Sequence, residues 1–206
     1  MLQGDCMDFM RDKPDKFWDL AIVDPEFGIG QFWMKSKHTY KFGDKKWNTK
    51  IPDRSYFEEL FRVSKNQIIW GGNYFTEFLI PTNSWIIWDK ERKLDKTFMS
   101  EAELAWTSFK IPMRILKVVW DGARKGTETG QTNIHPCQRP VKLHELTLKY
   151  YAKPGNKILD THGGSGSICI ACHNLGFDLD WIELDPDYYR DAIKRFENHK
   201  AQLRMF

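Results

Sequence analysis

A glycine-rich turn between a short apolar strand and a helix is the feature that most constrains the fold of this chain. Residues 157–159 form the strand pattern, Asp160 ends it, and the turn at 161–166 holds three glycines before a helix expected over 167–175. Glycines let a backbone approach a ligand closely, and the amide groups that open a helix can bind an anionic group. The element therefore predicts a nucleotide-type binding site on an α/β sheet.

An acidic residue after the next strand supports a ligand site at this turn. That strand is expected at 178–182, and Glu183 follows it, 23 residues after Asp160 (183 − 160). In dinucleotide-binding folds, an acidic residue at about this spacing contacts ribose hydroxyls. The Gly163-Gly164-Ser165-Gly166 order lacks the spaced three-glycine fingerprint of dehydrogenases, which disfavours that class. A purely structural turn remains the alternative.

Strand and helix patterns alternate along most of the chain. Strands are expected at 1–3, 19–23, 67–70, 84–89, 102–108, 157–159 and 178–182, and helices before Pro14, at 55–63, 141–152 and 167–175, and from Pro186 onward. Such alternation predicts an α/β fold with a mainly parallel sheet covered by helices on both faces. A length of 206 residues fits a single domain over 1–206.

Charge and cysteine content exclude several classes of protein. The net charge of +3, from 31 basic and 28 acidic residues, does not by itself indicate a polyanionic partner. We expect neither a membrane span, which needs roughly 20 apolar residues, nor a signal peptide. The four cysteines lack a disulfide framework, which favours a cytoplasmic setting. The run 169–173 matches a haem-attachment string, but its small apolar residues favour a helix face packed in the core.

A second candidate site follows the strand pattern at 20–23, where Asp24-Pro25-Glu26-Phe27-Gly28 begins. Open α/β sheets place ligands at the carboxyl ends of their strands. A carboxylate and a backbone carbonyl can accept hydrogen bonds from the exocyclic amine of a nucleobase, and an aromatic ring can hold the base by its face. Asp24, the Pro25 carbonyl and Phe27 supply these three groups in sequence. An ordinary strand-to-turn Asp-Pro is the alternative.

Both segments resemble motifs of the amino-methylating nucleic-acid methyltransferases. The first is similar to their catalytic Asp-Pro-Pro-Tyr tetrapeptide, and the second to their S-adenosylmethionine loop, Asp-Pro-Phe-x-Gly-Ser-Gly. In that loop Thr161 and His162 replace the proline and phenylalanine. Gly4-Asp5-Cys6, the run 135–140 (His-Pro-Cys-Gln-Arg-Pro for the family's His-Pro-Thr-Gln-Lys-Pro) and segments 66–75 and 103–107 extend the resemblance over nearly the whole chain. The order, tetrapeptide first and glycine loop last, resembles the permuted β class, and the middle segments resemble small phage-type members.

The resemblance implies a fold, a cofactor and a set of site residues. The fold is a Rossmann-like, mostly parallel seven-stranded sheet with helices on both faces, in which Asp24 and Asp160 end neighbouring strands and face one cleft. The cofactor is S-adenosyl-L-methionine, with no metal. The catalytic residues are Asp24, Pro25 and Phe27. The implied cofactor-binding residues are Asp5, Cys6, Gln138, Arg139, Asp160, His162, Gly164, Ser165, Gly166 and Glu183.

The implied partner is double-stranded DNA with a flipped adenine. An aspartate at the start of the tetrapeptide points to adenine N6, since cytosine-N4 enzymes of the family usually have serine there. A cytosine-N4 or RNA methyltransferase remains an alternative, and the oligomeric state is left as monomer or homodimer. The setting is a restriction–modification system or a phage.

Glu26 stands where the family has a second proline. Glutamate restores backbone freedom to the turn that aims Asp24 and Phe27, and it adds a negative charge close to Asp24. We therefore expect weakened catalysis, with an inactive cofactor- or DNA-binding homologue as one alternative. The other alternative is that Glu26 points into solvent and the turn survives.

Two loops, around 31–52 and 90–100, are the expected DNA contacts, inserted into the methyltransferase domain. Between Gln31 and Lys50, six lysines and one aspartate alternate with aromatic residues. Lysines in such loops bind phosphates without reading sequence. The candidate phosphate contacts are Lys35, Lys37, Lys41, Lys45 and Lys46. A solvated charged loop is the alternative, and the segment 127–132 is a third candidate that orders on binding.

Overall fold

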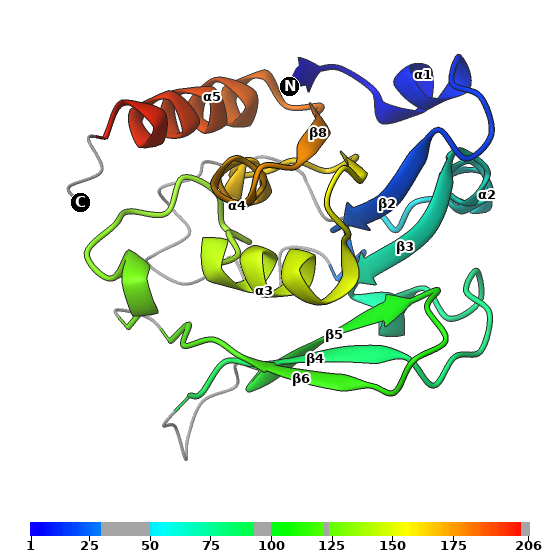
Figure 1. Ribbon diagram of the computed structural model, residues 1–206, viewed down its shortest axis with the longest axis horizontal. Coiled ribbons are helices and arrows are strands. Elements are labelled where there is room, and N and C mark those ends of the chain that lie inside the picture. The colour runs from blue at the N-terminus through cyan, green and yellow to red at the C-terminus, as the bar shows by residue number, and fades with distance from the viewer. Residues whose placement is uncertain (30–49, 93–99, 122–123, 203–206) are drawn as a thin grey trace.

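The computed structural model describes residues 1–29, 50–92, 100–121 and 124–202. Its strands are β1 (Leu2–Gln3), β2 (Trp18–Val23), β3 (Ser64–Trp70), β4 (Trp85–Asp89), β5 (Ala102–Thr107), β6 (Arg114–Lys117), β7 (Lys157–Asp160) and β8 (Asp178–Glu183). Its α-helices are α1 (Cys6–Arg11), α2 (Arg54–Val63), α3 (Val141–Tyr151), α4 (Ser167–Leu175) and α5 (Pro186–Ala201). Short 3-10 turns lie at η3 (Gly72–Tyr74) and η4 (Gly126–Glu128) (Figure 1). The α/β class is confirmed.

One mixed sheet runs through the described residues in the order β1-β8-β7-β2-β3-β5-β4-β6. The pairings from β1 to β3 are parallel, β5 is antiparallel to both β3 and β4, and β6 is parallel to β4. The sheet therefore has eight strands there, one more than expected. The additional strand is β6, a four-residue edge strand in which only Leu116 is buried. So short and exposed a segment has too little alternation of apolar and polar residues to be recognised in a sequence.

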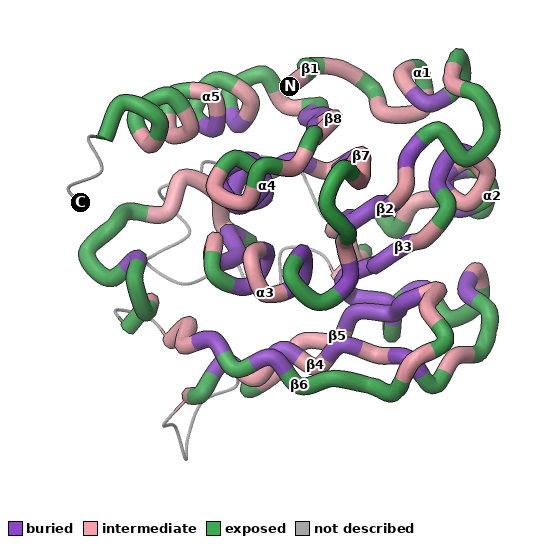
Figure 2. Tube along the Cα trace, viewed as in Figure 1, coloured by how far each residue is buried: buried purple, intermediate pink, exposed green. Residues whose placement is uncertain are grey.

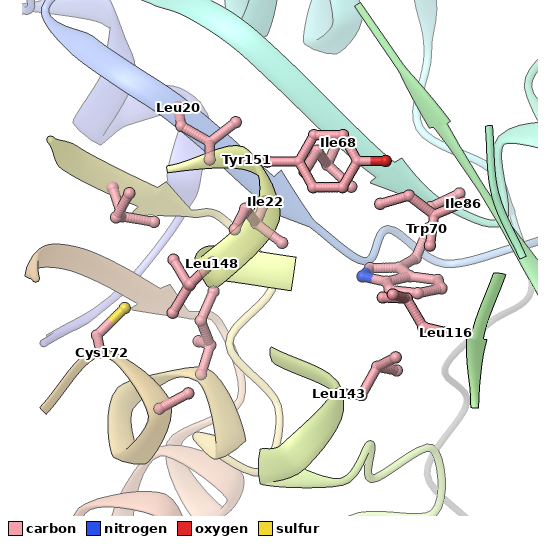
Figure 3. Packing of buried hydrophobic residues seen from close by; sticks show 14 of the residues in the cluster. Leu20, Ile22, Ile68, Trp70, Ile86, Leu116, Leu143, Leu148, Tyr151 and Cys172 are labelled. Atoms are coloured by element: carbon pink, nitrogen blue, oxygen red, sulfur yellow. The ribbon is translucent and has the colours of Figure 1, made fainter. Parts of the chain in front are cut away.

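Helices cover both faces of the sheet, as predicted. In β2, Leu20 and Ile22 pack with α3 and α4, while Ala21 and Val23 pack with α1 and α2, because successive side chains of a strand point to opposite faces. Figure 2 shows the buried positions concentrated along the central strands and on the inner sides of the helices. Figure 3 shows the first of these clusters, in which side chains of β2 and β3 meet those of α3 and α4. Cys169 and Cys172 belong to this cluster, as expected for a packed helix face.

The central strand β2 lies between β7 and β3. From β7 the chain continues to β8, toward one edge of the sheet, and from β3 it continues to β4 and β5, toward the other edge. The helix α4 connects β7 to β8 on one side, and α2 precedes β3 on the other. Open α/β sheets bind ligands at such a switch point, outside the carboxyl ends of the strands. Leu20 pairs with Ile158 and Ala21 with Leu159, so Asp24 and Asp160 emerge side by side despite the 136 residues between them (160 − 24). The prediction that they end neighbouring strands is confirmed.

Aspartates begin three of the helices around this edge. The side chain of Asp5 accepts the Met7 amide and caps α1, Asp53 caps α2, and Asp185 caps α5 directly before Pro186. Such caps satisfy amide groups that have no partner within the helix. Among the described helices, none is long and apolar enough to cross a membrane.

Candidate active site

A cavity of about 960 Å³ opens at the carboxyl ends of β2, β7 and β8. Residues of both candidate segments line it, together with the first turns of α1 and α5. The predicted site residues in its wall are Asp5, Cys6, Asp24, Pro25, Phe27, Arg139, Asp160, His162, Gly164, Ser165 and Glu183. Its volume lies within the roughly 300–1,000 Å³ of small-molecule sites. The side chains of Asp24 and Asp160 therefore face one cleft, as predicted.

Other predicted site residues lie elsewhere. Gln138 is buried, and its side-chain oxygen accepts the Ile134 amide, so it holds the chain ahead of α3 and is absent from the cavity wall. Gly166 lies behind the turn, against Ala192 of α5. The five candidate DNA-contact lysines at 35–46 lie outside the described residues. Lys90, at the start of the segment 90–100 that was expected to contact DNA, is buried, and its ammonium is 2.6 Å from a Glu103 oxygen.

The glycine turn is held against the end of β8. The Gly164 amide donates to Glu183 Oε2 at 2.6 Å, and the Asp185 amide donates to Glu183 Oε1 at 2.8 Å. A Cβ at Gly163 would overlap the indole of Trp181, and Gly164 has a positive φ of 51°. The turn thus needs glycine for both space and backbone conformation.

Asp160 and Glu183 form the acidic floor of the cavity. The pKa of Asp160 is raised to about 7, mainly by burial, with the nearby Glu183 adding to the shift and the His162 amide and Arg139 opposing it. Burial also raises the pKa of Glu183, against the amides of Asp185 and Gly164. A cationic group of a ligand would offset the energetic cost of keeping these buried carboxylates charged. These hydrogen-bond acceptors therefore fit a ligand that carries a positive charge and hydroxyl groups.

A small polar cluster forms the wall beside this floor. The hydroxyl groups of Tyr56 and Thr161 are 2.7 Å apart, and His162 Nδ1 is 2.9 Å from the Thr161 hydroxyl. Burial lowers the pKa of His162 to about 4, so its ring is neutral and aromatic at pH 7. A neutral ring can take the place of the phenylalanine found in the family's loop. Tyr56 was missed as a site residue because its position on α2 indicates only an apolar helix face.

Asp24 is paired with Arg139 in an ion pair. The same guanidinium lies 2.7 Å from Glu103 Oε2, and it stands over the Trp70 ring at 5.1 Å. Burial lowers the pKa of Arg139 to about 9, which still leaves it protonated at pH 7. Arg139, expected at the cofactor, therefore presents its charge to the candidate catalytic carboxylate. In the sequence, Glu103 stands out only as part of the segment 103–107 that resembles the methyltransferases. Nothing in its local pattern marks it as a partner of Arg139.

Phe27 is held in place by packing. Its ring stacks on Tyr74 with centroids 4.9 Å apart and planes 12° apart. A Cβ at Gly71 would overlap the Phe27 ring, and Gly71 has a positive φ of 69°. The close approach of Gly71 thus sets the height of the ring above the sheet. Tyr74 and Gly71 are contributions to the site that the sequence pattern did not indicate.

Glu26 lies in the wall of the cavity and is half-buried. The negative charges of Glu103 and Glu26 both act to raise the pKa of the Cys137 thiol. The glutamate therefore faces the cleft close to Cys137.

These features define an open α/β protein with a ligand cleft at its switch point, in which an acidic glycine turn faces an Asp-Pro-x-aromatic segment. The chain belongs to the DNA methylase family, whose model matches residues 28–194. The putative methylase YubD of Escherichia coli K12 is 24% identical, over 94% of this chain and 88% of YubD.

Solved structures share the fold over most of their length. The M1.HpyAVI–SAM complex superposes with a TM-score of 0.62 at 18% identity, covering 94% of this chain and 97% of M1.HpyAVI. The cytosine-N4-specific PvuII DNA methyltransferase superposes with a TM-score of 0.60 at 14% identity, covering 99% and 86%. An enzyme named for cytosine N4 thus has the same fold as this chain.

Proposed function

We propose that this chain is an S-adenosylmethionine-dependent DNA methyltransferase that acts on the N6 amino group of adenine. The observation that carries the proposal is the placement of Asp24 and Asp160, which end adjacent parallel strands and line one cavity. Membership of the DNA methylase family supports it independently.

The acidic half of the cavity would hold the cofactor, because its groups suit a cationic ligand with a ribose. Asp160 lies where it can attract a positively charged amino group, Glu183 lies at the turn where it can accept ribose hydroxyls, and the Gly164–Ser165 backbone allows close approach. Bound S-adenosylmethionine supplies an electrophilic methyl group on a sulfonium. The cavity fits the cationic sulfonium and amino groups of S-adenosylmethionine because Asp160 and Glu183 both line it.

The other half would hold the base. Asp24 accepts a hydrogen bond from the exocyclic amine and draws its nitrogen toward tetrahedral geometry, which frees the lone pair from the ring. The Pro25 carbonyl accepts the second amine hydrogen, and Phe27 supports the base by its face. Arg139 holds the Asp24 carboxylate in place through the ion pair. Positioning of the amine supplies most of the rate in such a site.

The choice of adenine rests on Asp24, because cytosine-N4 members of the family usually have serine at this place. The likeness to the cytosine-N4-specific PvuII enzyme is one of fold and leaves the base to be tested. We extend the proposal to the loops around 31–52 and 90–100 as DNA contacts. Lys90 is excluded from the phosphate contacts, because its ammonium is paired with Glu103.

A catalytically weakened homologue is the second candidate, and Glu26 favours it. The side chain lies in the cleft wall, where the family's proline would stiffen the turn. Such a chain would bind cofactor and DNA but transfer the methyl group slowly.

The test combines calorimetry with methyl transfer to unmethylated DNA. We expect cofactor binding, transfer of radiolabel from S-adenosylmethionine, and N6-methyladenine among the nucleosides after digestion. The Asp24→Ala variant is the control for contaminating activity. Finding N4-methylcytosine would replace the base assignment, binding without transfer would favour the weakened homologue, and no binding would overturn the proposal. Sequencing the methylated DNA would identify the target site.

A further inference from the structure

A buried ion pair lies behind the glycine turn, on the side away from the cavity. Arg195 of α5 donates from Nη2 to Glu128 Oε2 at 2.9 Å. The Glu128 residue is 4% exposed, and the Arg195 side chain is 14% exposed. Burying two charges is costly unless both are paired and hydrogen-bonded, so the remaining polar atoms of the pair decide what it does.

The arginine reaches the cofactor turn directly. Its Nη1 group donates to the Ser165 carbonyl at 2.9 Å and to the Ser167 hydroxyl at 2.8 Å. Both serines line the cavity, whereas Arg195 does not. One turn earlier on the same helix, Ala192 packs so closely that a Cβ at Gly166 would lie 3.2 Å from it. The inner face of α5 therefore backs the turn with a methyl group and a guanidinium.

The glutamate and Ser167 extend the network to the start of α3. Glu128 Oε1 accepts the Val141 amide at 2.7 Å, and the Ser167 hydroxyl donates to the Arg139 carbonyl at 2.6 Å. Val141 and Arg139 lie on either side of Pro140, which has no amide hydrogen to donate. The pair thus holds both the glycine turn and the backbone of the residue whose guanidinium meets Asp24.

We propose that Glu128 and Arg195 are a positioning pair that preorganises the turn for cofactor binding. The inference rests on the proposed cofactor, and neither residue of the pair lines the cavity. Arg195 fixes the Ser165–Ser167 backbone, and Glu128 fixes Arg195 together with the first amide of α3. A turn already held in its binding conformation loses less conformational entropy when the ligand binds, which raises affinity.

The test measures S-adenosylmethionine affinity by calorimetry, which requires no DNA target and no catalytic activity. Arg195→Met leaves Glu128 buried without a cation, so the double variant Arg195→Met/Glu128→Gln, which removes both charges, is the main one. We expect its cofactor Kd to rise about tenfold, equivalent to about 1.4 kcal/mol, while the Kd for DNA stays within about twofold. Arg195→Lys keeps the charge, but a single ammonium replaces the two guanidinium nitrogens that reach Glu128, Ser165 and Ser167. Its cofactor Kd should lie between those of the wild type and the double variant.

Arg62 provides the matched control. It also ties a helix to other segments, donating to the side chains of Glu59 and Asp15 and to the carbonyls of Met10 and Lys13, none of which lines the cavity. Arg62→Met should lower the melting temperature and leave the cofactor Kd unchanged. An equal loss of affinity in Arg62→Met and the double variant would overturn the proposal, as would an unchanged Kd in the double variant. If the double variant does not fold, the cofactor Kd of Arg195→Lys is compared with those of wild type and Arg62→Met by the same criteria. If the wild-type protein does not bind S-adenosylmethionine, the result contradicts the proposed function rather than the role of the pair.

Discussion

The two halves of the cleft are built in different ways. The glycine turn is held by backbone amides on Glu183 and by the buried Glu128–Arg195 pair behind it. The segment that begins at Asp24 is held by side chains, through one ion pair to Arg139 and one ring stack on Tyr74. In the glycine turn the groups that are held are backbone amides and a carbonyl, so substituting the turn's own side chains leaves these contacts in place. In the segment that begins at Asp24 the side chains themselves make the contacts, so a substitution there removes them. The comparison explains why glutamate in place of proline at position 26 is expected to affect the half of the cleft that would hold the base.

The largest expected effect is on the base half. Asp24→Ala removes the acceptor for the amine, and methyl transfer should fall by about 10²–10³-fold, as when one hydrogen-bonding group aimed at a reacting centre is removed. Single-turnover rates measure it, and the cofactor Kd should change little. If Asp24→Ala transfers methyl groups at the wild-type rate, Asp24 does not bind the amine, and the assignment of this half of the cleft to the base is wrong.

Asp160→Asn should act on the cofactor half. Losing a charged partner of the ligand's cationic group costs about 1.5–3 kcal/mol, or roughly ten- to 100-fold in Kd. Calorimetry with S-adenosylmethionine measures this loss. Asp178→Asn, at the exposed opposite end of β8, is the control and should bind as wild type. If Asp160→Asn binds S-adenosylmethionine with wild-type affinity, the Asp160 carboxylate does not contribute to cofactor binding.

The same carboxylate predicts a pH dependence. Its pKa is raised from 3.8 to about 7, so the folded apoprotein holds the proton more tightly than the unfolded chain does. The stability that this group contributes is present at low pH and is lost as the pH rises from 3.8 to about 7. Cofactor affinity should rise over the same range, because the ionised form attracts a cation. Thermal unfolding and calorimetry from pH 5 to 8 would show both trends, and both should flatten in Asp160→Asn.

Glu26→Pro should raise the rate of methyl transfer. Proline at a compatible position is worth about 0.4–1 kcal/mol, or roughly two- to fivefold in rate if the turn is stiffened in its active geometry. Glu26→Ala, which removes the charge but keeps the backbone freedom, separates the two causes. Equal rates in all three proteins would refute the hypothesis of a weakened turn.

The smallest effect concerns the ring stack. Tyr74→Leu removes an aromatic pair worth about 0.5–1.5 kcal/mol, so stability should fall by about 1 kcal/mol and the transfer rate by about twofold. Tyr150 is about half-exposed like Tyr74, but its ring contacts Arg114 rather than a residue of the cavity wall, so it is the matched control. Urea unfolding and steady-state rates measure the two effects. A rate loss comparable to that of Asp24→Ala would show that Tyr74 itself contacts the base.

The sequence by itself determined most of the helices and strands and indicated which of their ends carry reactive groups. Alternating apolar segments, the glycine turn and Pro186 marked the strands and helices to within a few residues, because these signals come from neighbours in the chain. Strand ends carrying Asp24, Asp160 and Glu183 placed the cleft, since parallel strands bring their carboxyl ends to one edge of the sheet.

Only the tertiary structure decided the partners of the charged residues. Arg139 meets Asp24 across 115 positions (139 − 24), and Arg195 meets Glu128 across 67. The edge strand β6 and the Tyr74 stack on Phe27 depend likewise on distant segments. Local periodicity shows which face of an element is buried, but it holds no information about which side chain from another element arrives there. The glycine turn was therefore visible in the sequence, while the buried ion pair that supports it was not.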